Sequence, residues 1–250
     1  MAAPVTRIPA AQPALRAVGA GFTHAGRRRG MNEDAILTDP AGALWAVADG
    51  LGGLGHGDVA ADIVIDALAR LPHGSDPADL AAALREANAA IRRRARDEGL
   101  GEMAATIVAA QIDGARATLA WAGDSRGYLA RAGGVERVTR DHSVVQELID
   151  RGGLAEAEAE THPQAHVVTR AVGAEDRLEP EMRAVDLRRG DVILLCSDGL
   201  TRCVPDRELA ATLARPEPPE TLARALMIAA LDRGAPDNVS VIVVRIEAAG

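Results

Sequence analysis

The sequence predicts an α+β fold in which antiparallel sheets are covered by pairs of helices. Two helix-like segments follow one another at about residues 58–71 and 76–98, two more at about 206–214 and 219–233, and strand-like segments separate the pairs. This order lacks the strict strand–helix alternation of a doubly wound parallel sheet. With 250 residues, 48% of them hydrophobic, the chain can bury one large core. We predict a single domain over residues 13–250, after a disordered lead-in at residues 1–12.

The first elements are a β-hairpin and a helix pair. AILTD and ALWAVAD are strand-like segments on either side of Asp39–Gly42, where Pro and Gly favour a reversal of the chain. The next segment carries apolar residues every four positions, and we expect Asp58 to cap this helix. The second helix has Ser75 or Asp76 as its cap and Pro77 at or near its first turn.

The second half of the chain begins with strands. Residues 106–139 contain short β-branched and apolar runs broken by glycine-containing turns, which predicts an antiparallel meander. Ser143 and Gln146 have the spacing of a capping box for a helix that runs through Arg151. Two more strands, at about residues 181–186 and 191–196, precede the second helix pair, and VSVIVVRI is the last strand.

Composition argues against several classes of partner. The net charge is -8 and aromatic residues make up only 2%, so neither a broad basic surface nor rings for base stacking favour nucleic-acid binding. Pro4, Pro9 and Pro13 interrupt any apolar run near the start that would suit a signal peptide or membrane anchor. Cys196 and Cys203 have no metal-ligand spacing and are interpreted as reduced thiols. We therefore expect a cytoplasmic protein.

Four aspartates lie next to predicted strands. Asp49 and Asp198 end strands and precede Gly, Asp124 lies in WAGDSR, and Asp237 comes just before the last strand. Because such strand ends are neighbours in an antiparallel sheet, their carboxylates can gather at one rim. Carboxylates about 4–5 Å apart repel by roughly 1–4 kcal/mol per pair and call for a cation, and oxygen ligands suit magnesium or manganese. Any one Asp-Gly is more often a simple turn, by roughly five to one, so a metal site is indicated only when several motifs occur together.

Joint evidence comes from seven segments that span nearly the whole chain. In order they are GRRRGMNEDA, VADGLGGLGHGDVAA, MAATIVAA, WAGDSRGYLAR, TRDHSVVQELIDRG, LLCSDGL and GAPDNVSVIVV. Their order and spacing resemble the metal-dependent protein phosphatases, the PPM family or type 2C Ser/Thr phosphatases. The resemblance implies a four-layer α/β/β/α sandwich with two central antiparallel sheets flanked by helix pairs. It also implies hydrolysis of phosphoserine and phosphothreonine by a metal-bridging hydroxide that attacks in line.

The resemblance assigns metal ligands by motif. It implies two core Mn²⁺ or Mg²⁺ ions, with Asp49 of VADG as the bridge and the carbonyl of Gly50 as a further ligand of one ion. Asp198 of SDG and Asp237 of PDN hold the other ion. Asp124 of GDSR, with Asp198, helps to hold a third, weaker ion.

Three residues of GRRRGMNEDA receive roles around the metals. Glu33 and Asp34 are expected to act on metal-bound waters. Arg29 falls at the position of the family's phosphate-binding arginine, and a guanidinium can donate two parallel hydrogen bonds to phosphate oxygens.

The match departs from the family pattern at two places. Leu51 stands where many members carry a histidine proposed as general acid, so we expect a metal-bound water to donate that proton, with His56 a poor second choice. The segment at about residues 153–173 corresponds to the family's flap beside the active site, and Ala165 and His166 replace its usual Arg and Asn.

The expected protein is a monomeric protein phosphatase without a nucleic-acid or membrane partner. Its partners are phosphorylated proteins, and it opposes a bacterial Ser/Thr kinase and dephosphorylates that kinase and its targets. The alternative is a pseudophosphatase or regulatory module that only binds phosphoproteins, which a missing metal ligand would favour. A dedicated regulatory phosphoprotein as its substrate also fits the sequence.

Overall fold

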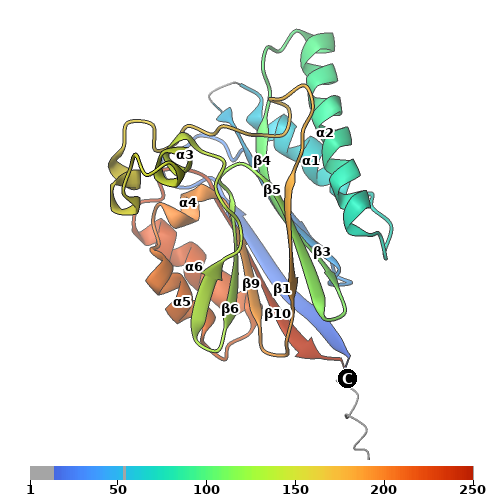
Figure 1. Ribbon diagram of the computed structural model, residues 1–250, viewed down its shortest axis with the longest axis vertical. Coiled ribbons are helices and arrows are strands. Elements are labelled where there is room, and N and C mark those ends of the chain that lie inside the picture. Colours follow the sequence, from blue (N-terminus) through green and yellow to red (C-terminus); the bar gives the residue numbers. More distant parts are fainter. Residues whose placement is uncertain (1–13, 53–54, 250) are drawn as a thin grey trace, which may run out of the picture.

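The computed structural model describes residues 14–52 and 55–249 and contains two five-stranded antiparallel sheets flanked by helices. Figure 1 shows the four layers, with α1 and α2 on one outer face and α5 and α6 on the other. The predicted α/β/β/α sandwich is therefore confirmed. The predicted lead-in at residues 1–12 lies outside the described residues.

One sheet has the strand order β2-β3-β4-β5-β8. Its strands are β2 (Asp34–Thr38), β3 (Leu44–Gly50), β4 (Ala105–Asp113), β5 (Arg116–Ala122) and β8 (Glu181–Asp186). Helices α1 (Gly57–Ala69) and α2 (Pro77–Glu98) pack on it through a core that includes Leu68, Leu84 and Ile107. At the start of α2 the Asp76 side chain accepts hydrogen bonds from two backbone N–H groups, as predicted.

The other sheet has the order β1-β10-β9-β6-β7. Its strands are β1 (Leu15–His24), β10 (Val239–Ala248), β9 (Val192–Cys196), β6 (Arg126–Arg131) and β7 (Gly134–Arg137). Helices α4 (Asp198–Thr201), α5 (Asp206–Leu213) and α6 (Pro219–Asp232) cover its outer face. Between the sheets lies a third apolar core, which includes Trp45 and Trp121.

Strand β1 was not predicted, because Gly19 and Gly21 weaken its pattern. A Cβ atom at Gly19 would collide with the indole of Trp45, so the glycine lets β1 approach the inter-sheet core. The predicted meander over residues 106–139 was also wrong as a single unit. The chain leaves one sheet after β5 and enters the other at β6, and each sheet receives one hairpin.

Two helices begin with different N-caps. Asp58 does not cap α1; His56 is the N-cap in a left-handed conformation, and Asp58 lies in the first turn. Ser143 does cap α3 (Val144–Asp150), where its hydroxyl accepts from the Gln146 N–H. A short 3-10 helix, η2 (Glu156–Thr161), follows α3. None of the helices in the described ranges is both long enough and apolar enough to span a bilayer.

Candidate metal centre

The predicted carboxylates lie at one end of the sandwich, where both sheets contribute strand ends. Asp34 begins β2 and stands opposite Asp49 in the β2–β3 ladder. Asp124 lies in the crossing between the sheets, Asp198 follows β9, and Asp237 precedes β10 by two residues. The antiparallel topology thus brings together segments that are more than 200 residues apart, such as Arg29 and Asp237.

A cleft of about 480 Å³ occupies this end of the molecule. Seven of the eight predicted site residues line it: Arg29, Glu33, Asp49, Gly50, Asp124, Asp198 and Asp237. The other lining residues are Leu51, Gly52, His166, Val168 and Arg202. Asp34 is the exception, and it is buried outside this lining.

Asp34 joins the two sheets. Its Oδ2 accepts hydrogen bonds from the hydroxyls of Ser240 at 2.7 Å and Ser197 at 2.9 Å, and both serines belong to the other sheet's strand ends. Burial raises the pKa of Asp34 to about 7, although these two hydrogen bonds lower it. Its Oδ1 is buried without a hydrogen-bond partner among the described residues. That oxygen can accept a hydrogen bond from a water.

The cleft carboxylates are costly to ionise together. Burial, followed by repulsion from Asp34 and Asp198, raises the pKa of Asp49 well above its usual range. Burial and the Asp198 charge raise the pKa of Asp124 to about 8. Burial also raises the pKa of Asp198, while the nearby Arg202 guanidinium lowers it. Such a cluster is stabilised in its ionised form by cations.

Two arginines supply positive charge to this cluster. Arg29 forms a fork with Asp237, with Nε 2.9 Å from Oδ1 and Nη2 3.0 Å from Oδ2. Arg202 bridges Asp198, at 2.5 Å, and Asp237, at 3.0 Å. Arg202 was not predicted as a site residue, although its spacing of four from Asp198 is the usual one for an ion pair on a helix.

Asn238 holds the loop that carries Arg29 and Glu33. Its side-chain Nδ2 donates to the carbonyls of Ala25 and Met31, and its Oδ1 accepts from the Glu33 N–H at 2.9 Å. The residue is buried, so all three contacts are shielded from water. Sequence reasoning used the PDN motif for its Asp alone and missed this role of the Asn.

The turn that carries Asp124 is fixed from the TRDHS segment. The Gly123 N–H donates to His142 Nδ1 at 3.1 Å, and the imidazole stacks on Trp121. The Arg126 guanidinium donates bidentate hydrogen bonds to the Asp141 carboxylate, with Nη2 2.6 Å from Oδ2 and Nε 3.0 Å from each carboxylate oxygen. The Asp141 carboxylate thus binds Arg126, and the start of α3 is capped by Ser143.

Gly50 and Leu51 lie where the chain turns from β3 toward α1. A Cβ atom at Gly50 would collide with the backbone of Gly57, so the close approach requires glycine. Leu51 lines the cleft with an apolar side chain. His56 is exposed at the start of α1 and is not among the described residues that line the cleft.

The residues of the cleft fit a hard divalent cation by their chemistry. The candidate donors are carboxylate and carbonyl oxygens, which suit Mg²⁺ or Mn²⁺, and the orphaned Oδ1 of Asp34 matches a site that holds water. Within residues 14–52 and 55–249, no three His, Cys, Asp or Glu side chains form a ready-made metal cage. As placed, Asp198 and Asp237 are instead held by Arg29 and Arg202.

Comparison with known sequences points to one family. The model of the family described as protein phosphatase 2C matches residues 23–239. The chain is 42% identical over 221 residues to the serine/threonine protein phosphatase PstP of Mycobacterium tuberculosis, which covers 86% of this chain and 42% of PstP. It is 33% identical over 234 residues to the serine/threonine phosphatase stp of Listeria innocua, covering 89% and 93% of the two chains. The chain thus spans about two fifths of PstP and nearly all of stp.

Solved structures give the same result. A crystal structure of M. tuberculosis PstP matches with a TM-score of 0.85 and 39% identity, covering 94% of this chain and 99% of that one. The PstP catalytic domain in complex with two manganese ions matches with a TM-score of 0.84 and 37% identity, covering 93% and 99%. PppA of Pseudomonas aeruginosa, described as a key regulatory component of T6SS, matches with a TM-score of 0.84 and 40% identity over 92% and 98%.

Proposed function

The chain belongs to the protein phosphatase 2C family, and we propose from this premise that it is a metal-dependent phosphatase of phosphoserine and phosphothreonine in proteins. The observation that carries the proposal is the cleft in which Asp49, Asp124, Asp198 and Asp237 meet beside Arg29. The raised pKa values of Asp49, Asp124 and Asp198, together with the all-oxygen chemistry of the cleft, call for divalent cations at the point where a phosphate would bind.

The proposed ions are Mn²⁺ or Mg²⁺, and the two manganese ions in the PstP catalytic domain support that choice. Asp49 would bridge two ions, the Gly50 carbonyl would complete the shell of one, and Asp198 and Asp237 would hold the other. Asp124 and Asp198 would hold a third, weaker ion. When bound, such a pair lowers the pKa of a water and neutralises charge on the phosphoryl oxygens during an in-line displacement.

The chain's own residues would position the phosphate and the waters. Half of the Arg29 side chain is exposed, so its fork can turn from Asp237 to two phosphoryl oxygens. The Glu33 carboxylate lies against Gly52, where a Cβ atom would collide with it, and it can accept hydrogen bonds from waters in the cleft. The Oδ1 of Asp34, which has no hydrogen-bond partner among the described residues, can accept a hydrogen bond from a further water. Leu51 offers no proton, so the proton for the leaving group would come from a water.

The alternative of a pseudophosphatase has no observation in its favour, because every proposed ligand is present and lines the cleft. The proposed substrates are phosphoproteins, among them a Ser/Thr kinase and its targets. We also propose a monomer in the cytoplasm. The free thiols of Cys196 and Cys203 suit that reducing compartment.

Purified protein tests the proposal directly. Hydrolysis of para-nitrophenyl phosphate and of a phosphothreonine peptide should require added Mn²⁺ or Mg²⁺ and stop with a chelator. Isothermal titration of Mn²⁺ into the protein should show binding that is lost in Asp49→Asn. Turnover that persists in chelator would reject the metal mechanism, and Mn²⁺ binding without turnover would favour the pseudophosphatase.

A further inference from the structure

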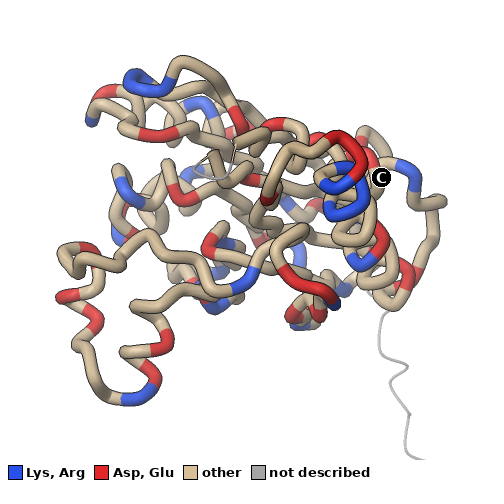
Figure 2. Tube along the Cα trace, turned by 90° about the horizontal axis from the view of Figure 1, so that it is seen from above, with Lys and Arg blue, Asp and Glu red and all other residues tan. Residues whose placement is uncertain are grey.

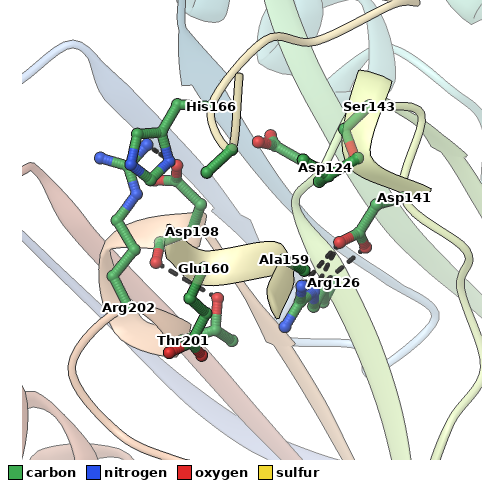
Figure 3. Close-up of a pocket in the computed structure, with 12 residues that line it drawn as sticks. Asp124, Arg126, Asp141, Ser143, Ala159, Glu160, His166, Asp198, Thr201 and Arg202 are labelled. Carbon is green, nitrogen blue, oxygen red and sulfur yellow. Dashed lines mark hydrogen bonds and ion pairs between the residues drawn. The ribbon is translucent and has the colours of Figure 1, made fainter. Parts of the chain in front are cut away.

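The cleft continues beneath the flap segment (residues 153–173). A second cavity, of about 310 Å³, shares Asp124, His166, Asp198 and Arg202 with the cleft and extends to Ala159 and Glu160 of η2. Figure 3 shows His166 and Arg202 on one side of this cavity and the Arg126–Asp141 pair on the other.

A third cavity, of about 320 Å³, extends the path away from the cleft. Seven residues line both the second and the third cavity: Arg126, Asp141, Ser143, Val145, Ala159, Glu160 and Thr201. The third cavity is also lined by Arg137, Gln146, Ile149, Glu156, Pro205 and Asp206. The second and third cavities therefore form one groove, called here the flap groove, which begins at the candidate metal centre and runs between η2 and the α4–α5 connection.

The far end of the flap groove is acidic. Four carboxylates but only two guanidinium groups line it, namely Asp141, Glu156, Glu160 and Asp206 against Arg126 and Arg137. Both arginines are directed to one carboxylate, because Arg126 lies 2.6 Å and Arg137 3.6 Å from Asp141. The Asp206 carboxylate accepts a hydrogen bond from the Tyr128 hydroxyl at 3.2 Å.

Two carboxylates remain for a ligand. Glu156 and Glu160 are exposed, and neither has an ion pair or a side-chain hydrogen bond with any described residue. Glu158, between them, is directed elsewhere, since it accepts from the Ala155 N–H and lines neither cavity of the groove. In Figure 2 the acidic positions of this segment lie along the loop that projects at the lower left.

We propose that the flap groove binds the substrate chain on one side of the phosphorylated residue and that Glu156 and Glu160 select lysine or arginine there. The proposal rests on the proposed phosphatase function, because it requires the phosphate to lie at the cleft. A side chain of opposite charge on an extended peptide would meet these carboxylates as the peptide leaves the cleft. The preferred substrates are thus phosphoproteins with basic residues beside the phosphosite.

Three peptides with one central phosphothreonine test the proposal. They carry lysines only on the N-terminal side, only on the C-terminal side, or alanines in both places, and kcat/KM is measured with Mn²⁺. Each value is divided by the same variant's rate on para-nitrophenyl phosphate, so that any change in basal activity cancels. One of the lysine peptides should exceed the alanine peptide by about three- to tenfold, and added salt should shrink this preference.

The double variant Glu156→Gln/Glu160→Gln should lose the preference, whereas Glu158→Gln, which removes the same kind of charge from the same turn, should keep it. Equal rates for all three peptides, or a preference that survives in the double variant, would overturn the inference. If the wild-type protein hydrolyses neither para-nitrophenyl phosphate nor any peptide, the proposed function itself fails, and this separates the two failures.

Discussion

Replacing Asp141 by Asn should destabilise the protein by about 2–3 kcal/mol. The Asp141 side chain is 8% exposed and that of Arg126 is 26% exposed, so the pair is mostly shielded from water. Removing one partner of a buried ion pair costs about 3–5 kcal/mol, because the remaining charge is left unpaired. The partial exposure of Arg126 and the acceptor oxygen that Asn retains reduce this figure. In a domain of this size, about 2–4 °C of melting temperature corresponds to each kcal/mol.

Urea unfolding followed by circular dichroism measures the loss, and Asp150→Asn is the matched control. Asp150 pairs with Arg140, but these side chains are 36% and 55% exposed, so its replacement should cost less than about 1 kcal/mol. The double variant Arg126→Met/Asp141→Leu should recover part of the stability, since neither charge is then buried alone. If Asp141→Asn costs no more than Asp150→Asn, the pair is not the stabilising contact that its geometry indicates.

Four further predictions concern metals, a helix cap and pH. Asp49→Asn should abolish Mn²⁺ binding in calorimetry and lower kcat/KM by about a hundredfold or more, since a catalytic metal contributes several kcal/mol; an unchanged isotherm would refute its role as ligand. Free Mn²⁺ at about 100 times its Kd should stabilise the wild-type protein by about 2.7 kcal/mol, seen as a higher melting temperature that chelator reverses. Asp76→Ala, which removes the cap of α2, should cost about 1 kcal/mol in urea unfolding and leave kcat/KM unchanged. Burial lowers the pKa of His142 from 6.5, so the unfolded chain takes up this proton first and the His142 contribution to stability is lost as pH drops below 6.5, while the buried carboxylates with raised pKa values contribute in the opposite direction. In urea unfolding, the stability of the wild-type protein relative to His142→Gln should therefore be lower at pH 5 than at pH 7, and an equal difference at both pH values would refute this reasoning.

Local patterns in the sequence were enough to predict most elements. The β2–β3 hairpin, the Asp76 cap and the helix pairs depend on neighbouring residues, and the structure has them where these signals lie. Strand β1 was missed because two glycines hide its pattern. Gly19 leaves room for Trp45, and Gly21 leaves room for Ile242, Thr38 and Ile36. The split of residues 106–139 between sheets was missed because sheet membership depends on partners such as β8 and β9, which lie far along the chain.

In the candidate site, too, local motifs could be predicted from the sequence, and contacts between distant segments could not. Motif spacing identified seven of the residues that line the cleft, whereas the depth of Asp34 depends on two serines that are 163 and 206 residues away. Arg202 was missed because an Arg four residues after an Asp is common on helices. Its bridge to Asp237 exists only once α4 and the start of β10 are side by side.

The hydrogen bonds from Ser197 and Ser240 to Asp34, which join the two sheets, determine when the site can form during synthesis of the protein. One sheet supplies Asp49 and the other supplies Asp198 and Asp237, so neither half of the sandwich holds the proposed centre by itself. A ribosome must have released the chain beyond Ser240 before the two sheets can close on each other. A nascent chain therefore cannot assemble the proposed centre until translation has passed Ser240, and on refolding, Mn²⁺ binding should return with the final closure rather than with the first secondary structure.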